Sequence, residues 1–156
     1  MKKLPLLLLG VVFAFSANSC SSSDKPLPIA PPVSTAPIAA TASQGTWHVT
    51  KYIDHSLDQT DHFAGYTFTF GSNNVLTATS SDGTITVTGT WSVTNNQTVD
   101  DSPSNPIDFN ILFSTPADFE DISDDWDIIS ISATKIEMTD VSGSSSNTDF
   151  ITFEKN

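Results

Sequence analysis

The sequence predicts an all-β fold, an antiparallel eight-stranded meander barrel that follows an apolar N-terminal segment. Three observations support this expectation. From about residue 44 onward apolar and polar residues alternate with a period of two, turn-forming residues separate the alternating runs, and no convincing amphipathic helix occurs. Because an open sheet would leave exposed edges, closure into a barrel is the expected arrangement.

The expected strands are short and follow one another closely. The clearest strand follows Asp82-Gly83 and places Ile85, Val87, Trp91 and Val93 on one face, with Thr and Ser residues on the other. Short helical turns are expected at 56–62 and 116–122, where a Pro can begin a first turn. The eight expected strands are 46–52, 66–70, 75–79, 85–93, 107–113, 126–131, 136–138 and 150–153.

The N-terminus contains the lone cysteine of the chain. Lys2 and Lys3 precede an apolar run at 4–15, and small residues at 16–19 lead to Cys20. The run is too short to span a bilayer, which needs about 20 residues. The segment resembles a bacterial lipoprotein signal, although Ala17 stands where the lipobox usually has Leu. The resemblance implies that Cys20 becomes the lipidated first residue of an outer-membrane lipoprotein.

Three regions follow from this reading. Residues 1–19 are the expected signal peptide, and residues 20–43 carry the lipidated cysteine and a Ser/Pro-rich tether. Residues 44–156 form the expected barrel domain. The barrel is therefore expected to be a monomer held to the membrane by its N-terminal lipid.

Charge and composition exclude several classes of protein. The net charge is −12, all six basic residues are Lys, and residues 44–156 contain three Lys and 17 acidic residues. A chain this acidic repels polyanions, so nucleic-acid binding is excluded. One Cys excludes an internal disulfide and multi-cysteine metal sites.

A tripeptide at the start of the first expected strand points to a family. Gly45-Thr46-Trp47, together with the segments 66–70, 89–93 and 150–155, is similar to lipocalins and their small bacterial lipocalin-like relatives. The resemblance implies that Trp47 packs across the closed end of the barrel. The family usually stacks an Arg on this Trp, and because the chain has no Arg, Lys155 or Lys135 would have to substitute.

The interior of such a barrel either holds one small ligand or is filled by side chains. Both alternatives remain open from the sequence. A small apolar ligand is the first functional hypothesis. Its candidate pocket lining consists of Tyr66, Phe68, Phe70, Trp91, Phe109 and Phe113.

An acidic segment before the sixth expected strand supports the alternative function, a surface interaction or inhibitor module with no internal ligand. The segment lacks the spacing and the Gly of an EF-hand, so a solvated loop is favoured over a Ca²⁺ site. The candidate interaction loop consists of Asp118, Glu120, Asp121, Asp124, Asp125 and Trp126.

Three histidines are the remaining metal-ligand types. His48 is expected to face outward, whereas His55 and His62 lie near acidic residues and form a conceivable zinc site for a metal-dependent hydrolase. Their spacing matches no zinc motif, and the chain has neither a Gly-x-Ser-x-Gly elbow nor a P-loop. The sequence therefore predicts a non-enzymatic protein with no metal and no cofactor.

Overall fold

A computed structural model describes residues 34–95, 106–141 and 148–156 of the chain. All of them belong to one compact unit, Pro31–Asn156. The expected signal peptide, Cys20 and most of the expected tether lie outside the described residues. The elements are α1 (Ala36–Ala42), β1 (Trp47–Asp54), β2 (Leu57–Asp58), η1 (Thr60–Phe63), β3 (Tyr66–Phe70), β4 (Val75–Ser80), β5 (Thr86–Asn95), β6 (Ile107–Leu112), α2 (Ala117–Glu120), β7 (Asp125–Ile131), β8 (Lys135–Val141) and β9 (Thr148–Lys155).

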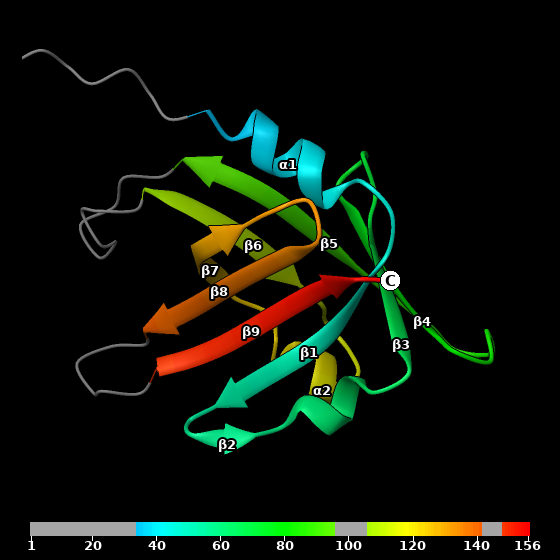
Figure 1. Cartoon of the computed structure of the whole chain (residues 1–156). Helices are drawn as coiled ribbons and strands as arrows, with labels where there is room; N and C mark the ends of the chain where they lie inside the picture. Colours follow the sequence, from blue (N-terminus) through cyan, green and yellow to red (C-terminus); the bar gives the residue numbers. More distant parts are fainter. Residues whose placement is uncertain (1–33, 96–105, 142–147) are drawn as a thin grey trace, which may run out of the picture. The chain divides into compact units, whose positions relative to one another are not determined.

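The strands form a closed antiparallel barrel. Strands β3 to β9 pair in sequence order, and β1 pairs with both β3 and β9, which closes an eight-stranded ring. Figure 1 shows β1 and β9 running side by side. The two-residue strand β2 extends the sheet beside β1 as a short hairpin. The predicted fold class is therefore confirmed, and β2 is an addition that the sequence did not indicate.

Each expected strand has a counterpart in the structure. One residue of these strands differs from the prediction. Ile85 was expected to face the core, but it lies just before β5 and is 50% exposed. Its backbone closes the hairpin instead, because its N–H donates to Ser80 Oγ and its carbonyl accepts from the Ser80 N–H. The inward-facing set of β5 begins at Val87.

Helix α1 corrects the expected end of the tether. Residues 36–43 were assigned to an unstructured spacer because of their Pro content, but Pro37 lies in the first turn, where its missing N–H is not needed. Ala-rich sequence then favours the helix. Ala42 is completely buried, and Ile38 and Ala39 pack against the core. The folded unit therefore begins before residue 44.

Trp47 is buried at the start of β1, beneath α1. Its indole N–H donates to the Ala42 carbonyl at 2.8 Å, and the Lys155 Nζ lies 5.2 Å from its ring centroid. Of the two lysines considered from the sequence, Lys155 is therefore the one that stacks on Trp47. Gly45 has a φ of +81°, and a Cβ there would come within 2.8 Å of the Lys155 side chain. Residues 45–47 therefore bring α1, the start of β1 and the Lys155 side chain into contact.

The two predicted helical turns are present as η1 and α2. Their buried residues, Phe63 and Phe119, have ring centroids 5.4 Å apart. The Ser123 hydroxyl fixes α2 to the barrel, since it accepts from the Phe113 N–H and lies 3.0 Å from the Phe119 carbonyl. Within the described part of the chain, every helix is too short or too polar to cross a bilayer.

Gly89 allows β5 to approach β6 closely, and replacing it tests this packing. A Cβ at Gly89 would lie 2.3 Å from the Leu112 carbonyl oxygen and 2.6 Å from the Phe113 ring. Gly89→Ala is expected to lower the free energy of unfolding by about 2–3 kcal/mol, measured by urea denaturation.

Gly83→Ala is the matched control. Gly83 has a φ of +71°, and a Cβ at this position would meet nothing within 4 Å, so only the left-handed backbone is penalised, by about 1 kcal/mol. Equal losses for the two variants would contradict the close approach at Gly89.

Candidate functional site

Of the six aromatic residues expected to line a ligand pocket, five are buried in the hydrophobic core and Tyr66 packs against that core. The Trp91 and Phe109 rings stack at 5.6 Å, and the Phe70 ring meets both edge-on at 5.3 Å. Phe68 is fully buried, whereas Tyr66 is only partly buried. These side chains therefore serve as packed core.

Phe119 completes this packing and was not singled out from the sequence. Its ring lies 5.1 Å from both Tyr66 and Phe113 and 6.0 Å from Phe68. It enters the interior from α2, a four-residue helix in the acidic segment. The only available signal was an apolar residue flanked by acids, which is typical of a short helix that buries one face.

The acidic segment divides between the surface and the core. Asp118, Glu120, Asp121 and Asp125 are exposed. Trp126 is 1% exposed, and its indole N–H donates to the Ile122 carbonyl at 3.0 Å. Its inclusion in an interaction loop is therefore wrong, because strand alternation turns Trp126 inward next to exposed Asp125.

A pocket of about 400 Å³ lies on the outer face of β5 and β6 beside Asp124 and Asp125, and we call it the acidic pocket. Asn110 pairs with both Ser92 and Asp125, which places three polar side chains in one row across the strands. Exposed Leu112 forms an apolar part of the wall. The pocket thus combines carboxylate, amide and hydroxyl oxygens with one aliphatic surface.

Asp124 has the most unusual environment in this pocket. Burial, followed by hydrogen bonding with Asp125, raises the pKa of Asp124 to about 6. Its backbone carbonyl accepts from the Ile111 N–H, which holds the residue against β6. The charge of the acidic pocket therefore changes as the pH passes through about 6.

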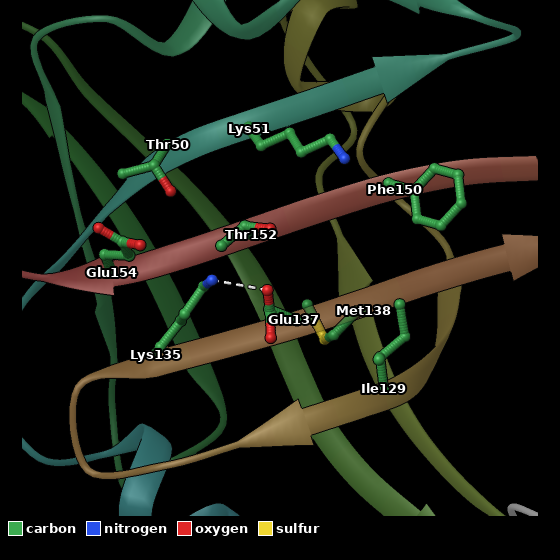
Figure 2. Close-up of a pocket in the computed structure, with 9 residues that line it drawn as sticks. All are labelled: Thr50, Lys51, Ile129, Lys135, Glu137, Met138, Phe150, Thr152 and Glu154. Atoms are coloured by element: carbon green, nitrogen blue, oxygen red, sulfur yellow. Dashed lines mark ion pairs between the residues drawn. The ribbon is translucent and has the colours of Figure 1, made fainter.

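A second concavity, of about 290 Å³, lies on the outer face of β1, β9, β8 and β7, and we call it the outer groove (Figure 2). Each side is formed by a β-bulge. The register of β1 with β9 shifts at Thr50, and that of β7 with β8 shifts at Ile129. Bulges redirect side chains. Both Thr50 and Ile129 line the groove.

One row of paired residues crosses the outer groove. Lys51 pairs with Thr152, and Thr152 pairs with Glu137. Both carboxylate oxygens of Glu137 have partners: Oε1 forms an ion pair with the Lys135 Nζ at 2.6 Å, and Oε2 accepts a hydrogen bond from the Ser130 hydroxyl. These partners lower the pKa of Glu137 and raise that of Lys135, so the pair is ionised.

The opposite side of the groove has unused polar groups. The Lys51 Nζ lies 5.0 Å above the Phe150 ring, and among the described residues it forms no ion pair. Thr152 is only 7% exposed, yet within the described part of the chain its hydroxyl makes no hydrogen bond. Figure 2 shows Thr152 between Lys51 and Glu137.

The histidines are distributed over separate environments. The His55 ring contacts Asp54 in the β1–β2 turn, and its backbone N–H donates to Asp149 at 2.8 Å. One potential ligand atom from each of Asp54, His55 and Asp149 lies within 4.8 Å of the other two. The Asp54 contact raises the pKa of His55, so the protonated ring can neutralise the carboxylates.

His62 has a different neighbour from His55. Its Nδ1 lies 3.7 Å from Asp118, so the two histidines contact different carboxylates instead of forming the shared site considered from the sequence. His48 faces the outside of β1 as expected from the alternation, although its Nδ1 is shielded and has no hydrogen-bond partner within the described residues.

Comparison with known proteins adds one structural likeness. No protein-family model matches the chain, and no curated protein matches it. A solved structure, that of a DUF4847 family protein from Bacteroides vulgatus ATCC 8482, is similar. Its TM-score is 0.48 at 16% identity, and the match covers 76% of this chain and 97% of that chain. The barrel assignment rests on the strand pairing described above.

The raised pKa of Asp124 predicts how stability changes with pH. The unfolded carboxyl ionises near 3.8, so the stability that the protonated group contributes is lost as the pH rises from about 4 to about 6. Asp124→Asn should therefore stabilise the protein at pH 7, by about 1 kcal/mol after allowance for solvent screening, and should have little effect at pH 3.

Urea denaturation at several pH values measures this difference. Exposed Asp61 provides the control, since Asp61→Asn removes the same charge without relieving a buried carboxylate. A gain for Asp124→Asn that is independent of pH would contradict the proposed environment of Asp124.

Proposed function

We propose that the chain is a non-enzymatic lipocalin-like lipoprotein that is anchored to the outer membrane through Cys20 and binds a protein partner on the outer surface of its barrel. The observation that carries this proposal is the aromatic packing of the interior. Three of the side chains that would have lined a ligand cavity, Phe70, Trp91 and Phe109, contact one another. Binding on the outside is therefore favoured over an apolar ligand inside.

The acidic pocket supplies the chemistry for a basic partner. Its oxygen-rich wall suits the ammonium or guanidinium group of a Lys or Arg side chain, and Leu112 offers an aliphatic surface for the stem of that side chain. The domain carries a net charge of −14, which attracts a basic partner during approach. The same charge keeps a tethered monomer away from anionic membrane surfaces.

A hexalysine peptide is a suitable first probe of this pocket. The protein is expected to bind it at low salt, and the affinity should fall at least about tenfold when Asp124→Asn and Asp125→Asn are combined, because the pocket loses its carboxylates. Isothermal titration calorimetry at pH 7 measures the change. Binding should also weaken below pH 6, as Asp124 becomes protonated.

The control variant combines Asp118→Asn with Glu120→Gln on α2, outside the pocket lining. It removes the same formal charge, so a local pocket predicts a smaller loss than that of the Asp124/Asp125 pair. Equal losses would indicate attraction by net charge alone and would contradict a defined pocket.

Lipid anchoring gives a separate prediction. Cells grown with an alkyne-labelled palmitate should incorporate the label into the wild-type chain, whereas Cys20→Ser should abolish labelling because the thiol is the expected acylation site. Ser22→Ala, two residues away, should leave it unchanged. Labelling of the Cys20→Ser chain at the wild-type level would exclude this anchor.

A further inference from the structure

The outer groove contains polar groups that the fold itself does not use. Lys51 and Thr152 face each other across the β1–β9 pairing, and Thr50 lies beside Lys51 because of the bulge in β1. Within the described residues, the Lys51 ammonium group and the hydroxyls of Thr50 and Thr152 make no hydrogen bond. Thr152 is 7% exposed and lines the groove, and its hydroxyl has no hydrogen bond among the described residues, so this hydroxyl is available to a bound molecule.

The ammonium group of Lys51, which forms no ion pair among the described residues, favours an anionic group at this end of the groove. Glu137 is paired with Lys135 and hydrogen-bonded by Ser130, and Lys51 lowers its pKa further by Coulomb attraction but forms no ion pair with it. Lys51 is one of three cations among 17 acidic residues in 44–156. A carboxylate between Lys51 and Thr152 would receive a charge-assisted hydrogen bond and a hydroxyl hydrogen bond at the same time.

The rest of the groove suits a hydroxylated ring. Glu154 offers acceptor oxygens at one end, and Phe150 and Ile129 provide apolar surface at the other. Figure 2 shows Glu154 at one end of the groove and Phe150 and Ile129 toward the other, with Glu154 and Phe150 on β9 and Ile129 on β7. The volume of about 290 Å³ is at the lower limit for ligand sites, so a single small molecule fits and an oligomer does not.

We propose that the outer groove is a binding site for a small hydroxylated carboxylate, a sugar acid of monosaccharide size. The carboxylate binds Lys51 and Thr152, and the ring hydroxyls donate to Glu154. This site is distinct from the acidic pocket, which lies on β5 and β6 and attracts cations. The two β-bulges that frame the groove fix Thr50 and Ile129 on its opposite sides, so the site is preformed.

Titration of the full-length protein in detergent micelles with glucuronate tests the proposal. Calorimetry is expected to give saturable binding with a Kd of about 1 mM, and glucose and hexanoate should each bind at least about tenfold more weakly. Glucose lacks the carboxylate, and hexanoate lacks the hydroxyls. Equal binding of hexanoate would show that any organic anion is attracted and would overturn the assignment to a sugar acid.

Substitutions locate the binding within the groove. Lys51→Met keeps the aliphatic stem and should weaken glucuronate binding at least about tenfold, whereas Thr152→Val, which is nearly isosteric, should weaken it about threefold. Lys155→Met is the charge-matched control, because Lys155 stacks on Trp47 outside the groove lining. Thr88→Val is the control for a lost hydroxyl, since Thr88 is exposed on β5.

The pattern of results decides between local and general effects. Loss of binding in Lys51→Met and Thr152→Val, with both controls unchanged, supports the proposal. Equal losses in Lys51→Met and Lys155→Met would reduce the effect to net charge and overturn it. Absence of saturable binding by the folded wild-type protein would also overturn it, and circular dichroism confirms folding in each case.

Discussion

The antiparallel pairing of β1 with β9 is the constraint on which the rest of the structure depends. It joins the first and last long strands from Trp47 opposite Lys155 to Ile53 opposite Phe150. Without this pairing both strands would be open edges, with unpaired backbone groups exposed to other chains. Closure also fixes which side chains point inward, since a register shift of one residue would reverse the faces.

This pairing fixes what each face of the barrel can do. Inward positions of β9 carry Ile151 and Phe153, and the Phe153 ring lies 5.3 Å from Phe68 and 5.4 Å from Phe70. The outward positions of the same strand carry Phe150, Thr152 and Glu154, which line the outer groove. The aromatic core and the groove thus lie on the two faces of the same β1–β9 pairing.

The period-two alternation was sufficient to predict the barrel, because each inward position needs an apolar side chain and each outward one tolerates a polar one. Tyr66–Phe70 illustrates this, since its strand bounds are those read from the sequence. Ile85 was misassigned because the alternation of apolar and polar residues already begins in the β4–β5 hairpin, whereas β5 itself begins at Thr86. Helix α1 was missed because Pro37 was counted among the prolines of an extended tether, although the first turn of a helix accepts a proline.

The candidate sites were less predictable than the fold, for a physical reason. Alternation identified Phe70, Trp91 and Phe109 as inward-facing, but whether such rings contact one another or surround a cavity depends on their geometry across strands. The outer groove depends on two β-bulges, and the residue types at Thr50 and Ile129 do not predict a bulge at either position. Cross-strand neighbours such as Lys51 and Thr152 are about 100 residues apart in the chain, so only the β1–β9 register brings them together.

Charge is distributed differently in the two concavities of the outer surface. The net charge of −14 describes the domain as a whole, yet at the outer groove Lys51 and Lys135 face Glu137 and Glu154, so local charge is balanced. At the acidic pocket Asp124 and Asp125 have no cation among the lining residues. A Coulomb interaction between exposed charges is screened within about 10 Å, so neighbouring groups decide what each site attracts. A strongly acidic barrel therefore combines a concavity with carboxylates and no cation on β5 and β6 with a charge-balanced concavity on β1 and β9.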